Sequence, residues 1–267
     1  MQVFAVPLPL AVISHMLGVL ARDRLKFRRL MNGTITGSAR MGLLRILGGA
    51  HAMYRLMGFL KSLLTLRRHE PDGSLITALV AAEQAGDSLS PDECLAMLFL
   101  LLFAGHETTV NLIGSGMLAL IDNPEQLTSL IGQPALADSA VEELLRYTNP
   151  VQFGASRIAL QDMELGEVAM KKHDVVIAML SSANRGEAIF QDPERLNISR
   201  DPNRHLGFGL GIHFCLGAPL ARMEGRIAFN KLLGRFPNIR LAVPRAEIRW
   251  RQSPVFRGLK SLPVYLE

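Results

Sequence analysis

The sequence predicts a mostly α-helical protein of the α+β class, with one long central helix and small β-sheets. Three observations support this prediction. Apolar residues recur at helical spacing through most of residues 1–150, and this spacing returns after residue 217. Between about residues 151 and 180 the pattern changes to short strand-like runs, such as the one at 175–179. A long apolar stretch near the middle begins with residues that favour a helix start.

The first helices are predicted around residues 9–20, 22–35, 50–69 and 74–85. Residues 3–20 are apolar enough to be mistaken for a signal peptide or a membrane anchor. However, no basic region precedes them, two prolines interrupt them, and His15 lies inside the run. These features argue against a signal peptide and against a membrane anchor.

The central helix has a clear predicted start and end. Ser90 and Glu93 form a capping box with Pro91 at the first helical position, and apolar residues continue to about Ile121. Asp122-Asn-Pro then ends this helix and begins another. A helix that is apolar nearly all round lies inside a protein core or a membrane. A further helix is expected from about residue 136 to residue 147.

A glycine-rich stretch from Phe208 to Gly217 holds the most informative residue, Cys215. Gly209 and Gly211 allow positive φ angles and the close approach of a bulky, flat partner. Pro219 suits the first turn of a following helix, whose N-terminus would favour an ionised sulfur. A cysteine between Phe and Leu is more often an inert core thiol, but the whole ten-residue pattern favours a metal-binding thiolate.

Three other kinds of motif, for zinc or disulfides, for a dinucleotide and for a zinc protease, do not match the sequence. The chain has only two cysteines, Cys94 and Cys215, so cysteine pairs cannot build a zinc cluster or a disulfide framework. The glycines at 207, 209 and 211 do not match a dinucleotide-binding loop. His106-Glu107 begins like a zinc protease motif, but Val110 stands where the second histidine is needed.

Four segments, in order along the chain, resemble motifs of the cytochrome P450 family of haem-thiolate monooxygenases. The stretch 208–217 resembles the haem-binding signature, and 104–109 (Ala-Gly-His-Glu-Thr-Thr) resembles the oxygen-activating motif of the central helix. Glu143-Leu-Leu-Arg146 resembles the E-x-x-R motif, and 200–205 resembles the meander before the haem loop. The resemblance implies a cytochrome P450 fold that lacks its N-terminal portion, because the pattern begins at an interior helix.

The resemblance also implies roles for individual residues. Cys215 is expected to bind the iron of haem b, while Glu107 and Thr108 manage protons for oxygen activation. Arg157 and His213 are expected to contact the haem propionates. Other expected haem contacts are Phe208, Gly209, Gly217, Ala104 and Gly105. Glu143, Arg146 and Arg200 are expected to form a structural charge network rather than a reactive site.

Taken alone, several of these residues have ordinary alternatives. His106 is more often a packed or surface histidine, Thr108 a plain helical threonine, and Arg157 a solvated strand charge. Glu143 and Arg146, three residues apart, would usually make a surface ion pair of small value.

The implied activity is monooxygenation of a small apolar organic molecule, with O₂ and with electrons from a separate ferredoxin and ferredoxin reductase. Two alternatives stay open: a peroxide-driven peroxygenase, and a non-catalytic, shortened haem-binding or interaction protein. The expected location is the cytoplasm, consistent with two lone cysteines.

Size and charge fit a soluble enzyme. The 267 residues, 49% of them hydrophobic, can form one large domain or two lobes. We expect a single partial domain over 1–267, helical to about 150, with strands and the haem loop beyond. The net charge of +5 suits an acidic protein partner. Nucleic acid is the rival partner, suggested by the basic run 22–29, but its pattern is more typical of a solvated helix face. We expect neither nucleic acid nor membrane binding.

Overall fold

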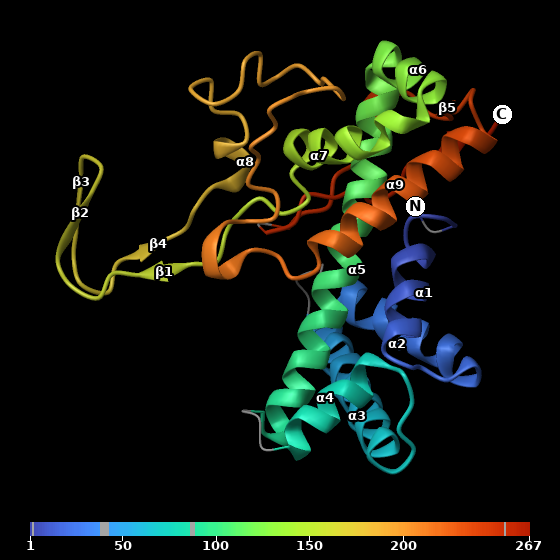
Figure 1. Ribbon diagram of the computed structural model, residues 1–267, viewed down its shortest axis with the longest axis vertical. Coiled ribbons are helices and arrows are strands. Elements are labelled where there is room, and N and C mark those ends of the chain that lie inside the picture. Colours follow the sequence, from blue (N-terminus) through green and yellow to red (C-terminus); the bar gives the residue numbers. More distant parts are fainter. Residues whose placement is uncertain (2, 38–42, 86–88, 254) are drawn as a thin grey trace. The chain divides into compact units, whose positions relative to one another are not determined.

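The computed structural model describes residues 1, 3–37, 43–85, 89–253 and 255–267 (Figure 1). Contacts divide the chain into two compact units, one formed by residues 2–107 and the other by Met1 with residues 108–267. The boundary falls within helix α5 (Pro91–Asp122), so each unit holds part of that helix. A single domain over the whole chain stays a prediction.

The first unit is helical. It contains α1 (Pro7–Met16), the short 3₁₀ turn η1 (Ala21–Asp23), α2 (Arg24–Gly37), α3 (Leu43–His69), α4 (Leu75–Gln84) and the first part of α5. Helices α2 and α3 lie side by side, and α4 packs on α3 (Figure 1). Apolar side chains from all five helices form its core, among them Ile13, Phe27, Leu60, Ile76 and Leu98.

Side-chain caps set two of these helix starts. Ser74 caps α4 by accepting a hydrogen bond from the amide of Thr77. At the start of α5, the Ser90 amide donates to the Glu93 carboxylate at 2.8 Å, and the Glu93 amide donates to Ser90 Oγ at 3.3 Å. The predicted capping box is therefore present, and the predicted ends of α5 are correct to within one residue.

The second unit places three helices around the later part of α5: α6 (Pro124–Gly132), α7 (Ala137–Thr148) and α9 (Ala218–Arg235). A methyl group built on Gly116 of α5 would lie 2.8 Å from the Phe229 ring of α9 and 3.2 Å from Leu144 of α7. Glycine at this position therefore permits α5 to pack closely against α7 and α9. Their shared core includes Leu112, Leu118, Val141, Leu144 and Phe229.

Strands are short, as the sequence predicts. Antiparallel pairs join β1 (Arg157–Ile158) to β4 (Val175–Val176), β2 (Met163–Leu165) to β3 (Val168–Met170), and β5 (Arg240–Leu241) to β6 (Val264–Tyr265). The register places Arg157 opposite Val176. The remaining elements are α8 (Leu180–Ala183) and the 3₁₀ turns η2 (Pro134–Leu136), η3 (Gly211–His213) and η4 (Arg245–Glu247).

Helix α5 is long and apolar enough to cross a membrane, and half of its most apolar window is buried inside the protein. The core helix of a soluble protein passes the same test. Both predicted environments, protein core and membrane, are thus compatible with its length and composition, and its burial favours the core.

Candidate functional site

The loop before α9 holds Cys215 as a free, solvent-exposed thiol. Gly209 and Gly211 both adopt the predicted positive φ angles, +71° and +69°. The Cys215 amide donates to the Phe208 carbonyl at 2.9 Å, and the Cys215 carbonyl accepts from the Ala218 amide at 3.2 Å. The thiol therefore sits on a loop fixed at both sides, three residues before a helix that has proline in its first turn.

The surroundings of this thiol are apolar and open. Four apolar side chains on the same loop are exposed: Leu210, Ile212, Phe214 and Leu216, with Ile212 at 99% and Leu216 at 85%. Isolated exposed apolar residues are common, but a contiguous group marks a binding surface. The alternative of an inert core thiol does not fit, since Cys215 is exposed while Cys94 is buried.

Phe208 connects this loop to a polar cluster behind it. Its ring is nearly buried and meets the Phe214 ring edge-on at a centroid distance of 6.4 Å. The guanidinium of Arg222, on α9, lies 4.6 Å from the centre of the Phe208 ring. Glu142 of α7 holds this guanidinium through two hydrogen bonds of 2.7 and 2.8 Å.

Glu142 also contacts His205 of the meander, whose Nε2 lies 3.0 Å from the carboxylate. The Gly207 amide donates to His205 Nδ1, so Nε2 carries the proton in the neutral ring and donates to Glu142. Burial alone would raise the pKa of Glu142, but hydrogen bonds from Arg222 and His205 outweigh it and hold that pKa at about 2. Glu142 is therefore ionised at neutral pH.

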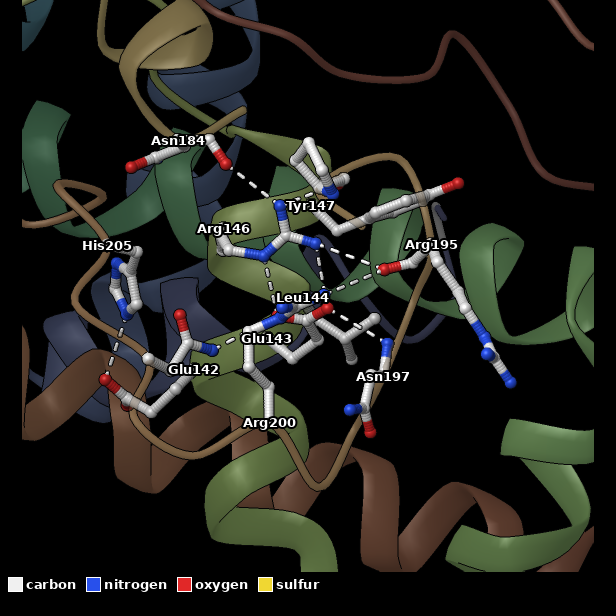
Figure 2. A network of polar contacts seen from close by, with 12 residues as sticks. Glu142, Glu143, Leu144, Arg146, Tyr147, Asn184, Arg195, Asn197, Arg200 and His205 are labelled. Carbon is white, nitrogen blue, oxygen red and sulfur yellow. Dashed lines mark hydrogen bonds and ion pairs between the residues drawn. The ribbon is translucent and has the colours of Figure 1, made fainter. Parts of the chain in front are cut away.

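The next residue along α7, Glu143, is fully buried and belongs to a polar network (Figure 2). Its carboxylate pairs with Arg146 through bonds of 2.7 and 2.8 Å, and both side chains have no exposed area. The remaining donors of Arg146 reach the carbonyls of Asn184, Pro193 and Arg195. All five N–H donors of this guanidinium thus have acceptors.

Arg200 joins the same network from the meander. Its Nε donates to Glu143 at 3.1 Å, and a terminal nitrogen reaches the carbonyl of Arg195 (Figure 2). Its terminal nitrogens also reach the carbonyls of Gln191 and Asp192. The structure therefore brings together the three residues expected to form a charge network. It buries the Glu143–Arg146 pair rather than leaving it on the surface, as the ordinary alternative would.

Several members of these clusters were missed from the sequence. Asn184 lies fully buried, donates to the Asn149 side chain at 2.8 Å and accepts from the Leu206 amide at 2.7 Å. Asn149 ends α7 in the left-handed conformation, a position that asparagine favours, so the Asn149-Pro150 pair was a usable local clue. Nothing local marks Asn184, because its partners lie 22 to 38 residues away.

The two expected propionate ligands are exposed. Arg157, on β1, donates to the backbone carbonyls of Ala155 and Ser156 at 3.1 and 3.2 Å. His213 lies in η3, two residues before Cys215, with its side chain exposed. Neither position tests the expected contact with a propionate, so both roles stay predictions.

The expected proton-handling residues lie on α5. Glu107 is nearly buried, Thr108 is partly exposed, and His106 is buried, which agrees with a packed histidine. Ala104 is exposed and Gly105 partly so. Residues 104–107 belong to the first unit and Cys215 to the second, so their alignment on one cofactor is part of the proposal below.

Glu224 on α9 is a buried carboxylate that was not predicted from the sequence. Burial raises its pKa to about 7, and a hydrogen bond from Thr109 of α5 offsets only part of this. Among the described residues, its Oε2 atom has no hydrogen-bond partner. Nothing local in the sequence marks its burial, which depends on the packing of α9 against α5.

The family model that matches this chain is "Cytochrome P450", over residues 49–238. The chain belongs to the cytochrome P450 family. The polyketide biosynthesis cytochrome P450 PksS of Bacillus subtilis is 46% identical over the whole chain, which covers 65% of that protein. The monooxygenase PikC of Streptomyces venezuelae is 41% identical over 99% of this chain and 62% of its own length.

Solved cytochrome P450 structures share the fold. The structure of Bacillus subtilis PksS matches all of this chain and 68% of its own, with a TM-score of 0.92 and 45% identity. P450BioI, solved in complex with an acyl carrier protein ligated to hexadec-9Z-enoic acid, matches with a TM-score of 0.89 and 38% identity. That match covers 99% of this chain and 67% of P450BioI. The chain thus spans just under two thirds of the curated relatives' length.

Cytochrome P450 proteins bind haem b through a cysteine thiolate. The residues around Cys215 are chemically suited to bind haem b. One exposed thiol stands on a positive-φ glycine loop, flanked by exposed apolar side chains and by the cation of Arg222.

Proposed function

We propose that this chain carries the haem-binding and oxygen-activating part of a monooxygenase located in the cytoplasm. The observation that supports the proposal most is the exposed Cys215 thiol on its glycine loop, directly before α9. The names of the relatives, which include monooxygenases, point the same way. Bound haem would supply an iron centre at which O₂ is reduced and one oxygen atom is transferred to the substrate.

Each side chain has one task in this proposal. Cys215 binds the iron as a thiolate, and Arg157 and His213 bind the propionates through charged hydrogen bonds. Glu107 holds a proton that it passes toward the oxygen, and the Thr108 hydroxyl orients that transfer. The apolar side chains of the loop, including Ile212 and Leu216, exclude water from the sulfur.

The substrate in this proposal is an apolar molecule of acyl or polyketide type. The support lies in the relatives: one is named for polyketide biosynthesis, and another was solved with an acyl chain ligated to a carrier protein. In this proposal electrons come from a separate ferredoxin and its reductase, and the net charge of +5 suits an acidic protein partner of that kind.

Isotope labelling tests the reaction. With haem-loaded protein, a ferredoxin, its reductase and labelled O₂, one labelled oxygen atom should enter a fatty-acyl or macrolide test substrate. Thr108→Ala should lower the yield of product per electron at least threefold. Turnover with peroxide alone would select the peroxygenase alternative. Binding of haem with no turnover from either oxidant would select the non-catalytic alternative.

A further inference from the structure

The positive charge of this protein is concentrated in two helices. Residues 24–69 contain ten of the 29 lysine and arginine residues and none of the 24 acidic residues. The rest of the chain therefore holds 19 basic and 24 acidic residues, a net charge of −5. The overall charge of +5 is thus the sum of one strongly basic segment and an acidic remainder.

The described side chains place this charge on the outer face of α2. Phe27, Leu30 and Met31 turn inward and are buried, while Arg24, Lys26, Arg28 and Arg29 are exposed. Helical spacing places Lys26 and Arg29, three residues apart on α2, in one stripe. Like charges at this spacing repel one another, so intrahelical pairing does not explain the arrangement.

Helix α3 continues the same face. Lys26 lies over the ring of Phe59 of α3, with its Nζ 5.4 Å from the ring centre. Arg55 precedes Phe59 by one helical turn and is exposed, so it stands next to the α2 stripe. Within the described part of the chain, no acidic side chain makes an ion pair with Lys26, Arg29 or Arg55. These cations are available to an external partner.

Two exposed apolar side chains accompany the charge. Leu25 of α2 is 68% exposed and Tyr54 of α3 is 79% exposed. Protein interfaces combine such anchors with a charged rim, whereas a phosphate backbone binds mainly through charge. A membrane surface needs a broad apolar face to insert, and the larger apolar side chains of α2 are buried in the unit's core.

We propose that the outer face of α2 and α3 docks an acidic carrier protein of the acyl-carrier type. This inference rests on the carrier-borne form of the substrate proposed above, and it adds the surface that recognises the carrier. Carboxylates of the partner pair with Lys26, Arg29 and Arg55, while Leu25 and Tyr54 make the apolar contacts. Because the attraction between the two proteins is electrostatic and long-ranged, it accelerates their association and weakens as salt is added.

Charge reversal on the face tests the proposal. The full chain is titrated with a purified bacterial acyl carrier protein by calorimetry, in about 50 mM salt and in about 300 mM salt. The triple variant Lys26→Glu, Arg29→Glu, Arg55→Glu should raise the dissociation constant at least tenfold in low salt. High salt should weaken the wild-type complex and remove most of the difference.

A matched control uses three exposed cations of the other unit. The variant Lys231→Glu, Arg235→Glu, Lys260→Glu makes the same change in net charge and should bind the carrier with less than a threefold change. Circular dichroism verifies that both variants fold. Equal weakening by the two triple variants would overturn the proposal, because net charge rather than this face would then control binding.

Other outcomes are also decisive. Absence of carrier binding by the wild-type chain would contradict the proposal. So would selective loss of binding to anionic vesicles or to a short DNA duplex, with carrier binding unchanged. Haem binding is read separately from the spectrum of the carbon monoxide complex. Loss of docking with that spectrum and with turnover intact would overturn this inference alone, whereas absence of the wild-type spectrum, or of turnover with O₂, would overturn the proposed function.

Discussion

The Glu143 network and the Cys215 loop lie in the same unit, and they differ in what they need from outside the chain. In the network, buried charges find their partners within the protein, and the guanidinium of Arg146 uses all its donors. On the loop, a thiol and four apolar side chains are exposed to solvent. The first region is built to hold the fold, and the second is built to hold a ligand.

This difference predicts that damage to the two regions is seen in different measurements. Substitutions in the network should lower the stability of the chain with or without haem. Substitutions on the loop should leave stability nearly unchanged and act on haem binding.

The largest loss of stability is expected from Glu143→Gln. The change leaves the fully buried Arg146, and the largely covered Arg200, without a counter-charge, at a cost of about 3–5 kcal/mol. Chemical denaturation of the haem-free chain measures the loss. Asp138→Asn is the matched control on the same helix, because its pair with Arg226 is exposed and 3.4 Å long. That control should cost less than about 0.5 kcal/mol, and an equal loss in both variants would refute the distinction.

Glu224 offers a pH-dependent test of burial in the same unit. Because its pKa is raised to about 7, the folded chain holds this proton more tightly than the unfolded chain does. Stability from this group is therefore present below pH 4.5 and is lost as the pH rises to about 7. Glu224→Gln should be more stable than the wild type by up to about 2 kcal/mol at pH 8.

At pH 4 the Glu224→Gln variant and the wild type should have similar stability, because the wild-type carboxyl is then protonated in both states. Thermal unfolding at the two pH values measures the difference. A constant offset between the variants across this range would show that Glu224 does not titrate as burial predicts.

Arg222 joins the two regions, so its substitution should affect both measurements modestly. It pairs with Glu142, next to the network, and lies over the Phe208 ring, whose backbone holds Cys215. Because its side chain is 41% exposed, Arg222→Gln should cost only about 1 kcal/mol. It should also weaken haem binding severalfold.

Arg226→Gln is the control for Arg222, one turn further along α9 and similarly exposed. It should change neither the denaturation midpoint nor the haem affinity measurably. A loss of stability in Arg222→Gln with unchanged haem affinity would show that this arginine serves the fold alone.

The smallest effect on stability is expected on the loop itself. Ile212→Ser and Leu216→Ser remove side chains that are almost fully exposed, so each should change the free energy of unfolding by less than about 0.5 kcal/mol. Haem titration of the same variants should show weaker binding. A large loss of stability from either would mean that these side chains pack within the fold.

The sequence predicted the helices well where a local rule sets their ends. The capping box at Ser90 and the prolines at 124 and 219 correctly placed three helix starts. Contacts between distant segments were harder to predict, because residues 60 or more positions apart, such as Glu142 and His205, share no local pattern.

The contact between α7 and α9 does have a recognisable pattern in the sequence. Asp138 and Glu142 are four residues apart on α7, and Arg222 and Arg226 are four apart on α9. Two complementary charge pairs at helical spacing predict that the helices pack side by side. The network of Glu143, Arg146 and Arg200 was predicted from its resemblance to two family motifs. The burial of Glu224 could not be predicted in this way, because it depends on the packing of α5 against α9.

The central claim is that Cys215 binds haem iron as a thiolate. The direct measurement is the carbon monoxide difference spectrum of the reduced, haem-loaded chain, for the wild type, Cys215→Ala and Cys94→Ala. We expect the red-shifted Soret band of thiolate-bound haem in the wild type and in Cys94→Ala, whose altered residue is buried away from solvent. Its absence from the wild type, or its persistence in Cys215→Ala, would contradict the claim.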